Sequence, residues 1–166
     1  MAAGRIIEVA NYIVAELNAE VAAFDESGNP ISPALFTADR AYYTEYRNTD
    51  LVNLKVDVRH PAVATAEESR GGTEDTYGIE IAMQQAVVRT NLAALDALVT
   101  LARRVARTFP VTAVLPITSS DPALFQVQVA ENLHLVFDPD KLARGQFYSL
   151  VSLAIVEFAA NAANAQ

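Results

Sequence analysis

The stretches Leu54-Lys-Val-Asp-Val-Arg59 and Tyr77-Gly-Ile-Glu-Ile-Ala-Met83 decide the fold. In both, apolar residues alternate with polar or small ones, which is typical of a strand with one buried face. Residues 60–75 between them are polar and too numerous for a tight hairpin turn. A loop of that length in a compact domain is usually functional or disordered. We therefore predict a hairpin whose loop reaches toward a neighbouring subunit.

Two other segments show the three- and four-residue apolar spacing of amphipathic helices. The first covers residues 4–20, and turn-forming residues follow it from Asp25 to Pro30. The second begins after the helix N-cap candidates Thr90 and Asn91 and stops at Pro110. Each helix has one face to bury, so the pattern predicts two helices packed on a sheet.

The remaining segments favour strands. Residues 35–47 are rich in aromatic residues and threonine, and residues 125–129 and 133–137 form two short alternating runs. Residues 138–145 indicate a turn with one helical turn, before a long apolar strand over residues 146–158. We predict an α+β fold with a mostly antiparallel sheet, covered on one face by two helices, and a long extended β-hairpin arm. Residues 1–166 form one domain in this prediction, with a frayed tail at 159–166.

Composition narrows the function classes. The net charge is −8, from 20 acidic and 12 basic residues, which argues against a surface that grips nucleic acid but is compatible with one past which DNA slides. Cysteine is absent, so a disulfide framework and thiolate chemistry are excluded. We expect neither a signal peptide nor a membrane span, since the apolar run at 147–158 is short and contains Glu157. Only 19% of the residues are charged, which favours an oligomer.

The sequence contains no motif that indicates catalytic, cofactor-binding or metal-binding residues. His60 and His134 stand without the spacing of a metal or catalytic motif, and the carboxylate pairs, such as Asp138 and Asp140, lie in predicted turns. The Gly71-Gly72 pair lacks the spacing of a phosphate-binding loop. We therefore do not expect an enzyme or a bound cofactor.

The tyrosines near residue 43 allow two interpretations. Tyr42, Tyr43 and Tyr46, with the neighbouring arginines, could form a stacking platform for single-stranded nucleic acid. Alternation places Tyr42 and Tyr46 on one face and Tyr43 on the other, and the chain is acidic. We favour a strand that packs both faces.

The order of these features resembles the tail terminator and neck (tail-completion) proteins of long-tailed bacteriophages. The resemblance spans residues 5–158. The segments that carry it, in order, are an N-terminal helix at Arg5–Leu17, Ala38-Asp-Arg-Ala-Tyr42, residues 51–58, Ser69-Arg-Gly71, Tyr77-Gly-Ile-Glu-Ile81, Leu95-Asp-Ala-Leu-Val99, Asp138-Pro-Asp-Lys-Leu-Ala-Arg-Gly-Gln-Phe-Tyr-Ser149 and the last apolar strand. This chain departs from the family pattern in its longer segment at residues 110–136.

The resemblance implies a structural virion protein that is assembled in the host cytoplasm. It would form a hexameric ring at the head-proximal end of the tail, stop polymerisation of the tail tube and join the tail to the head connector. Its partners would be further copies of itself, the tail tube protein and a connector or neck protein, and DNA would pass through the lumen without specific binding. A neck, head-completion or sheath-end protein of the same fold is the alternative.

In a closed ring, one patch on each subunit contacts a different patch on its neighbour. The hairpin and the last apolar strand supply the candidate contacts, because a strand edge can pair with a neighbouring chain. These candidates are Glu67, Glu68, Ser69, Arg70, Glu74, Asp75, Tyr148 and Leu150. A small ligand-binding or enzymatic α+β protein is the second hypothesis, motivated by the acidic residues at 67–75 and by Asp138 and Asp140.

Overall fold

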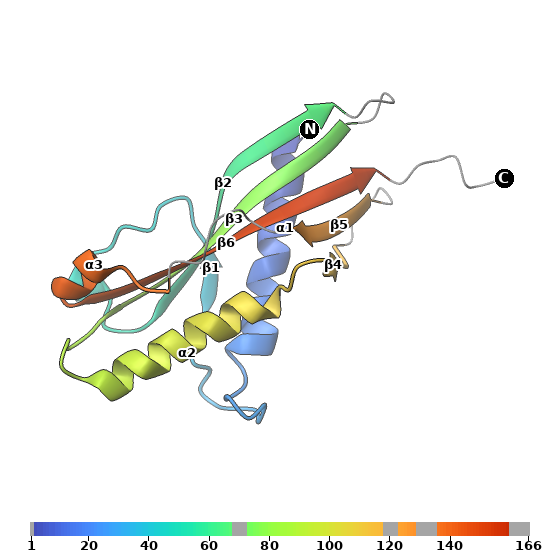
Figure 1. The fold of residues 1–166 in the computed structure, drawn as a ribbon. Helices are drawn as coiled ribbons and strands as arrows, with labels where there is room; N and C mark the ends of the chain where they lie inside the picture. Colours follow the sequence, from blue (N-terminus) through green and yellow to red (C-terminus); the bar gives the residue numbers. More distant parts are fainter. Residues whose placement is uncertain (1, 68–72, 118–122, 129–135, 160–166) are drawn as a thin grey trace.

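A six-stranded sheet forms the centre of the molecule in the computed structural model, which describes residues 2–67, 73–117, 123–128 and 136–159 (Figure 1). The elements are α1 (Ala2–Glu16), a π-helical turn η1 (Leu17–Val21), β1 (Ala38–Arg40), a 3-10 turn η2 (Asn48–Asp50), β2 (Lys55–Glu67), β3 (Thr73–Ala86), α2 (Leu92–Thr108), β4 (Val114–Leu115), β5 (Ala123–Gln128), α3 (Pro139–Ala143) and β6 (Gln146–Ala159). The spatial order of the strands is β1-β2-β3-β6-β5-β4. All neighbours are antiparallel except β1 and β2, which are parallel.

The register places the apolar side chains of the three long strands on one face. Val58 lies opposite Ile81, and Ile81 lies opposite Val151, so the three side chains form a row across the sheet. All three are 0 or 1% exposed. They form one core cluster with α1, through residues such as Ile13, and with α2, through residues such as Val105. The expected α+β fold, with two helices against one face of the sheet, is confirmed.

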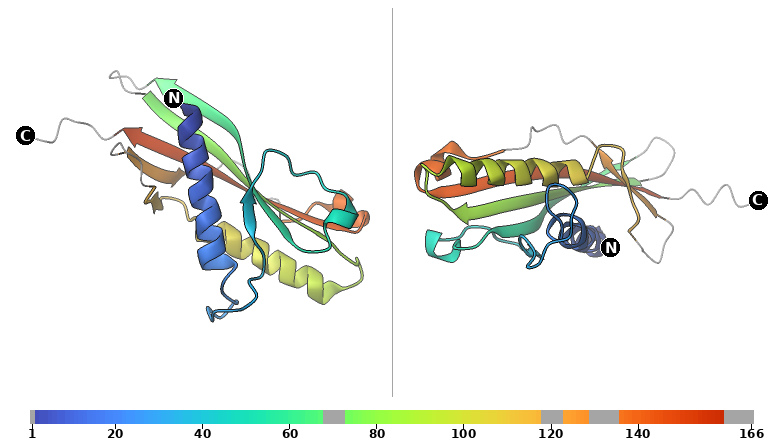
Figure 2. Two further views of the ribbon diagram at one scale, coloured as in Figure 1. Left: turned by 180° about the vertical axis from the view of Figure 1, so that it is seen from behind. Right: turned by 90° about the horizontal axis from the view of Figure 1, so that it is seen from below.

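The helices meet different parts of that face. α1 contacts β1, β2 and β3, whereas α2 contacts β6 and η1. Figure 2 shows that the sheet twists strongly along its long strands, so the two helices lie at a large angle to each other although they share one core. Asn91 caps α2 as its sequence predicts, accepting a hydrogen bond from the backbone N–H of Ala94.

The predicted strand over residues 35–47 is wrong for most of its length. Only Ala38–Arg40 are in a strand, and the chain from residue 41 to 54 crosses the second face of the sheet. There the side chain of the fully buried Gln84 donates to the carbonyl of Thr44 and accepts from Gln146. Tyr42 and Tyr43 are 76% and 67% exposed, so they do not pack two faces of a strand. The aromatic content of this segment favoured a strand. In the structure, the segment lies outside the sheet, where the carbonyl of Thr44 accepts the hydrogen bond of the buried Gln84 amide.

The predicted polar loop at residues 60–75 is also largely wrong. β2 continues to Glu67 and β3 starts at Thr73, so most of those residues are paired in the sheet. The register shifts between Arg59 and Ala62, where β2 has one extra residue relative to β3. Such a bulge reverses the phase of side-chain alternation. Because of this reversal, no single alternating pattern runs through the whole of β2 in the sequence.

The C-terminal elements agree with the sequence prediction where the structure describes them. Asp138 caps α3, a single short helix, and Gly145 after it has φ 78°, a conformation that favours glycine. The last strand, β6, lies in the sheet interior between β3 and β5, which explains its two apolar faces. In the region predicted to hold two short strands, β5 is present and residues 136 and 137 are not in a strand. Residues 133–135, His134 among them, and the tail from residue 160 lie outside the described residues.

Candidate functional site

The outer half of the β2–β3 hairpin has one open side. β1 pairs with β2 only at residues 56–58, and no other described strand lies on that side of β2 beyond them. We call the side of residues 59–67 that faces away from β3 the open edge of β2. The side chains of residues 61–66 along it are exposed. A row of outward backbone groups is a template for pairing with another strand.

The hydrogen bonds of β1 identify which backbone groups face outward. The N–H of Ala41 donates to the carbonyl of Val58 (3.0 Å), so the peptide groups of Val58 face β1. Those of Arg59 then face β3, and after the bulge Ala62 resumes the pairing opposite Gly78. Because this orientation alternates along a strand, the N–H and C=O groups of Val63 and Thr65 face the open edge.

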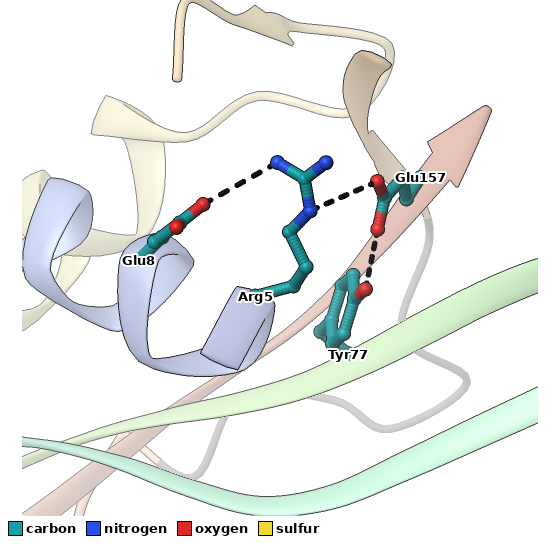
Figure 3. A network of polar contacts seen from close by, with 4 residues as sticks. All are labelled: Arg5, Glu8, Tyr77 and Glu157. Atoms are coloured by element: carbon teal, nitrogen blue, oxygen red, sulfur yellow. Dashed lines mark hydrogen bonds and ion pairs between the residues drawn. The ribbon is translucent and has the colours of Figure 1, made fainter. Parts of the chain in front are cut away.

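A partly buried polar network links the hairpin to β6 and α1 (Figure 3). The hydroxyl of Tyr77 on β3 donates to the carboxylate of Glu157 on β6. Arg5 of α1 also reaches Glu157, with 3.6 Å between Nε and Oε1, and its guanidinium lies 3.5 Å from Glu8. Burial first, and then the hydrogen bond to Glu157, raises the pKa of Tyr77. The tyrosine therefore stays a neutral donor, and the outer half of β3 is held against β6 and α1.

The predicted contact residues divide between two places. Glu74 and Asp75 lie near the start of β3, in the outer half of the hairpin, where Asp75 accepts a hydrogen bond from Thr65 (2.6 Å). Glu67 ends β2, and Glu68, Ser69 and Arg70 lie outside the described residues. Tyr148 and Leu150 instead lie in β6 opposite Gln84 and Ala82. The structure therefore does not bring all the candidates together.

Tyr148 makes its main contacts within its own chain. Its side chain is 9% exposed, and the ammonium of Lys141 lies 3.7 Å from the centre of its ring. Burial raises its pKa. Leu150 is half-buried on the same face of β6. The open edge of β2 is the better exposed of the two predicted contact regions.

A second candidate site is a cavity between α2 and the β1–β2 pair, which we call the Asp57 cavity. Its volume is about 890 Å³, within the usual range of small-molecule sites. Apolar side chains line it together with polar groups from β1 and β2. The larger apolar residues of the lining are Leu35, Phe36, Leu54, Val56, Leu98 and Leu101.

Asp57 is the unusual polar group of this cavity. It is 5% exposed, and its Oδ2 atom has no hydrogen-bond partner among the described residues. Burial raises its pKa, the hydrogen bond from Tyr46 opposes that shift, and the nearby charge of Asp39 adds to it. In return, burial and the contact with Asp57 raise the pKa of Tyr46 to about 12. An unpaired buried carboxyl group is costly unless something complements it.

Local sequence patterns do not indicate this site. Lys55, Asp57 and Arg59 alternate with apolar residues in a strand that is predicted to have one buried face, and this pattern does not distinguish Asp57 from its two neighbours. The parallel pairing of β1 and β2 places Asp39 directly opposite Asp57, and the segment that crosses the second face covers Asp57. Both features depend on non-local pairing, and periodicity within one strand does not report them.

His60 and Asp138, which the sequence singled out as possible functional residues, make contacts that stabilise the fold. His60 contacts the Tyr42 ring edge-on, with 4.9 Å between ring centres, and burial lowers its pKa. Asp138 accepts hydrogen bonds from the N–H groups of Asp140 and Lys141, as a helix cap does. Among the described residues, no group of three or more histidine, aspartate or glutamate side chains is placed to hold a metal ion.

Comparison with protein-family models finds no match to this chain, and comparison with curated proteins finds none either. Within the described part of the chain, no helix has both the length and the apolar character needed to cross a membrane.

Proposed function

We propose that this chain is a structural virion protein that forms a ring at the head-proximal end of a phage tail. In this role it terminates polymerisation of the tail tube and joins the tail to the head connector, and it has no catalytic function. The order of sequence segments described above motivates the proposal. The observation that supports it best is the open edge of β2 on a hairpin that is fixed firmly to the domain.

The geometry suits a closed ring. A heterologous ring needs two different patches on each subunit, so that one subunit's first patch meets its neighbour's second patch. The open edge of β2 supplies one patch with backbone donors and acceptors already extended. The Tyr77–Glu157 contact reduces the freedom that this patch would lose on binding.

The charge is compatible with a DNA passage. A net charge of −8 disfavours tight contacts with phosphates, so a lumen formed by six such chains would let a genome slide through. A neck, head-completion or sheath-end protein of the same fold requires the same ring symmetry and is the alternative within this proposal.

Native mass spectrometry and electron microscopy, with and without purified tail tubes, test the proposal. We expect rings of the chain alone or caps at one end of each tube. Particles that lack the protein distinguish the alternatives, because overlong tails indicate a terminator and tailless heads indicate a neck protein. A chain that stays monomeric in both conditions, together with normal particles in its absence, contradicts the proposal.

A further inference from the structure

We propose that the Asp57 cavity is the second patch of the ring contact, and that it receives the outer half of the β2–β3 hairpin of a neighbouring copy of this chain. The inference rests on the proposed function, which requires two different patches on each subunit. It is carried by the positions of the hairpin and the cavity, by the apolar surface that each exposes, and by outward-facing backbone groups at the cavity.

The hairpin and the cavity lie at opposite ends of the same two strands (Figure 1). The cavity is lined by Leu54, just before the first residue of β2, and by Gln85, next to the last residue of β3. The hairpin joins the other ends of these strands, which pair along their length and cannot bend back, so the hairpin does not reach the cavity of its own chain. Patches at opposite ends give head-to-tail contacts between copies, as a heterologous ring requires.

Both surfaces expose apolar side chains. In the cavity, Leu35 is 46% exposed, and Leu54 and Leu101 are half-buried. On the hairpin, the exposed side chains of residues 62–66 belong to three alanines, a valine and a threonine. Small uncharged side chains can enter an apolar cavity without leaving a charge buried, and removing both apolar surfaces from water favours the contact.

Backbone groups at the cavity are placed to pair with the open edge of β2. The side chain of Asn18 accepts a hydrogen bond from the N–H of Ala38 (2.8 Å) and donates one to its C=O (3.1 Å). The backbone groups of Ala38 in β1 therefore point away from β2, and those of Arg40, two residues later, point the same way. Because Arg40 lines the cavity, its N–H and C=O can bond the outward groups of Val63 or Thr65 of a neighbour.

The charges of the hairpin are complementary to cations at the cavity. In the described part of β2 and β3 beyond the bulge, the charged side chains are the carboxylates of Glu67, Glu74 and Asp75. The cavity lining contributes cations that form no ion pair with a described carboxylate. These cations are Arg40, Lys55 and Arg104. Opposite charges around an apolar contact favour the correct register of two surfaces.

The lining also contains carboxylates, but half of them are occupied. Asp25 accepts hydrogen bonds from Ser27 and Asn29, and Asp57 is 5% exposed. The accessible carboxylates of the lining are therefore Glu26 and Asp39. An acidic hairpin thus meets more accessible cations than carboxylates.

Cross-linking between single-cysteine variants tests the contact, because the natural chain contains no cysteine. Ala64→Cys places a thiol on the exposed hairpin, and Ala97→Cys places one on an exposed position of the cavity lining. The two variants are mixed, with and without tail tubes, and treated with a short bismaleimide. We expect covalent heterodimers. Ala93→Cys, which is exposed on α2 outside the cavity, replaces Ala97→Cys in the control. Equal cross-linking of the control, or none to Ala97→Cys, overturns the proposal.

A charge placed in the cavity gives a second, independent readout. Leu35→Glu should weaken association by about tenfold or more, because the contact would bury an unpaired carboxylate. Leu92→Glu adds the same charge to α2 at a position that is 68% exposed and outside the cavity, and should associate as the wild type does. Light scattering and cap formation on tail tubes measure association, and circular dichroism checks the fold. Unchanged association of the folded Leu35→Glu variant overturns the proposal.

Failure of this inference differs from failure of the proposed function. Rings or caps that form without a link between Ala64→Cys and Ala97→Cys overturn the inference and leave the proposed function standing. A cross-linked assembly that neither caps tubes nor affects tail length supports the inference and contradicts the proposed function. Cross-linking of Ala97→Cys to the tube protein, in place of a second copy, overturns the assignment of the occupant. A chain that stays monomeric with and without tubes overturns both.

Discussion

The hydroxyl of Tyr77 donates a hydrogen bond to the carboxylate of Glu157, although the two residues are 80 positions apart in the sequence. The bond joins β3 to β6 near the outer end of the hairpin, and Arg5 connects the same carboxylate to α1. The hairpin, β6 and α1 therefore meet at the side chain of Glu157. This arrangement makes the hairpin part of the domain's cooperative structure.

Tyr77→Phe should lower the free energy of unfolding by about 1–3 kcal/mol, because it removes a hydrogen bond from a buried tyrosine to a partly buried carboxylate. Urea denaturation measures the loss. Tyr43→Phe is the matched control, since the Tyr43 hydroxyl also donates to a carboxylate, that of Glu45, but on an exposed side chain. Equal stability of the two variants would contradict the role of the Tyr77–Glu157 contact.

Asp57→Asn should change the pH dependence of stability. Burial raises the pKa of Asp57 above its usual 3.8, so the folded state holds this proton more tightly than the unfolded state. The resulting stabilisation is complete below the unfolded-state pKa and is lost as the pH rises through the folded-state pKa. Melting curves from acidic to neutral pH should therefore show the variant gaining stability relative to the wild type as the pH rises. A stability difference between the variant and the wild type that stays constant with pH would refute this. Asp96→Asn removes a carboxylate from an exposed position of α2 and controls for the loss of a charge.

Val63→Pro should abolish ring or cap formation while the monomer stays folded. Proline removes the N–H that faces the open edge and leaves the β2–β3 hydrogen bonds in place. Val63→Thr keeps the N–H and the strand propensity, so it should assemble normally. Size-exclusion chromatography with light scattering measures assembly, and circular dichroism checks the fold. Normal assembly by a folded Val63→Pro variant would exclude pairing along this edge.

Asp138→Ala should destabilise the protein by about 1 kcal/mol, the usual effect of losing a helix N-cap. Its Oδ1 atom accepts two backbone hydrogen bonds, of 2.9 Å from Asp140 and 3.1 Å from Lys141. Asp140→Ala removes an exposed carboxylate from the same turn without removing the cap, so a smaller loss is expected. Thermal unfolding of the pair decides between a capping role and a general effect of charge.

Local patterns were sufficient for much of the fold. The two amphipathic helices, the cap at Asn91 and the interior strand β6 follow from spacing that a single segment contains. The outer half of β2 did not follow, because the bulge after Arg59 interrupts its alternation. The predicted strand around Tyr42 and Tyr43 was wrong for another reason, because tertiary contacts of residues 41–54 override the strand propensity of the two tyrosines.

Of the two candidate sites, one could be predicted from local sequence patterns and the other could not. The open edge lies in the hairpin that the sequence singled out, although its residues are strand and not loop. Asp57 could not be singled out, because its burial depends on Tyr46 and its electrostatic environment on Asp39, residues that only the folded chain places beside it.

The bulge between Arg59 and Ala62 also separates two sets of evolutionary constraints within one strand. Before it, Val56 and Val58 are held by the core, so few substitutions there would be tolerated. After it, residues 61–66 are exposed, and changes to their side chains leave the core untouched. The side chains of the outer half of β2 can therefore change while the inner half preserves the fold.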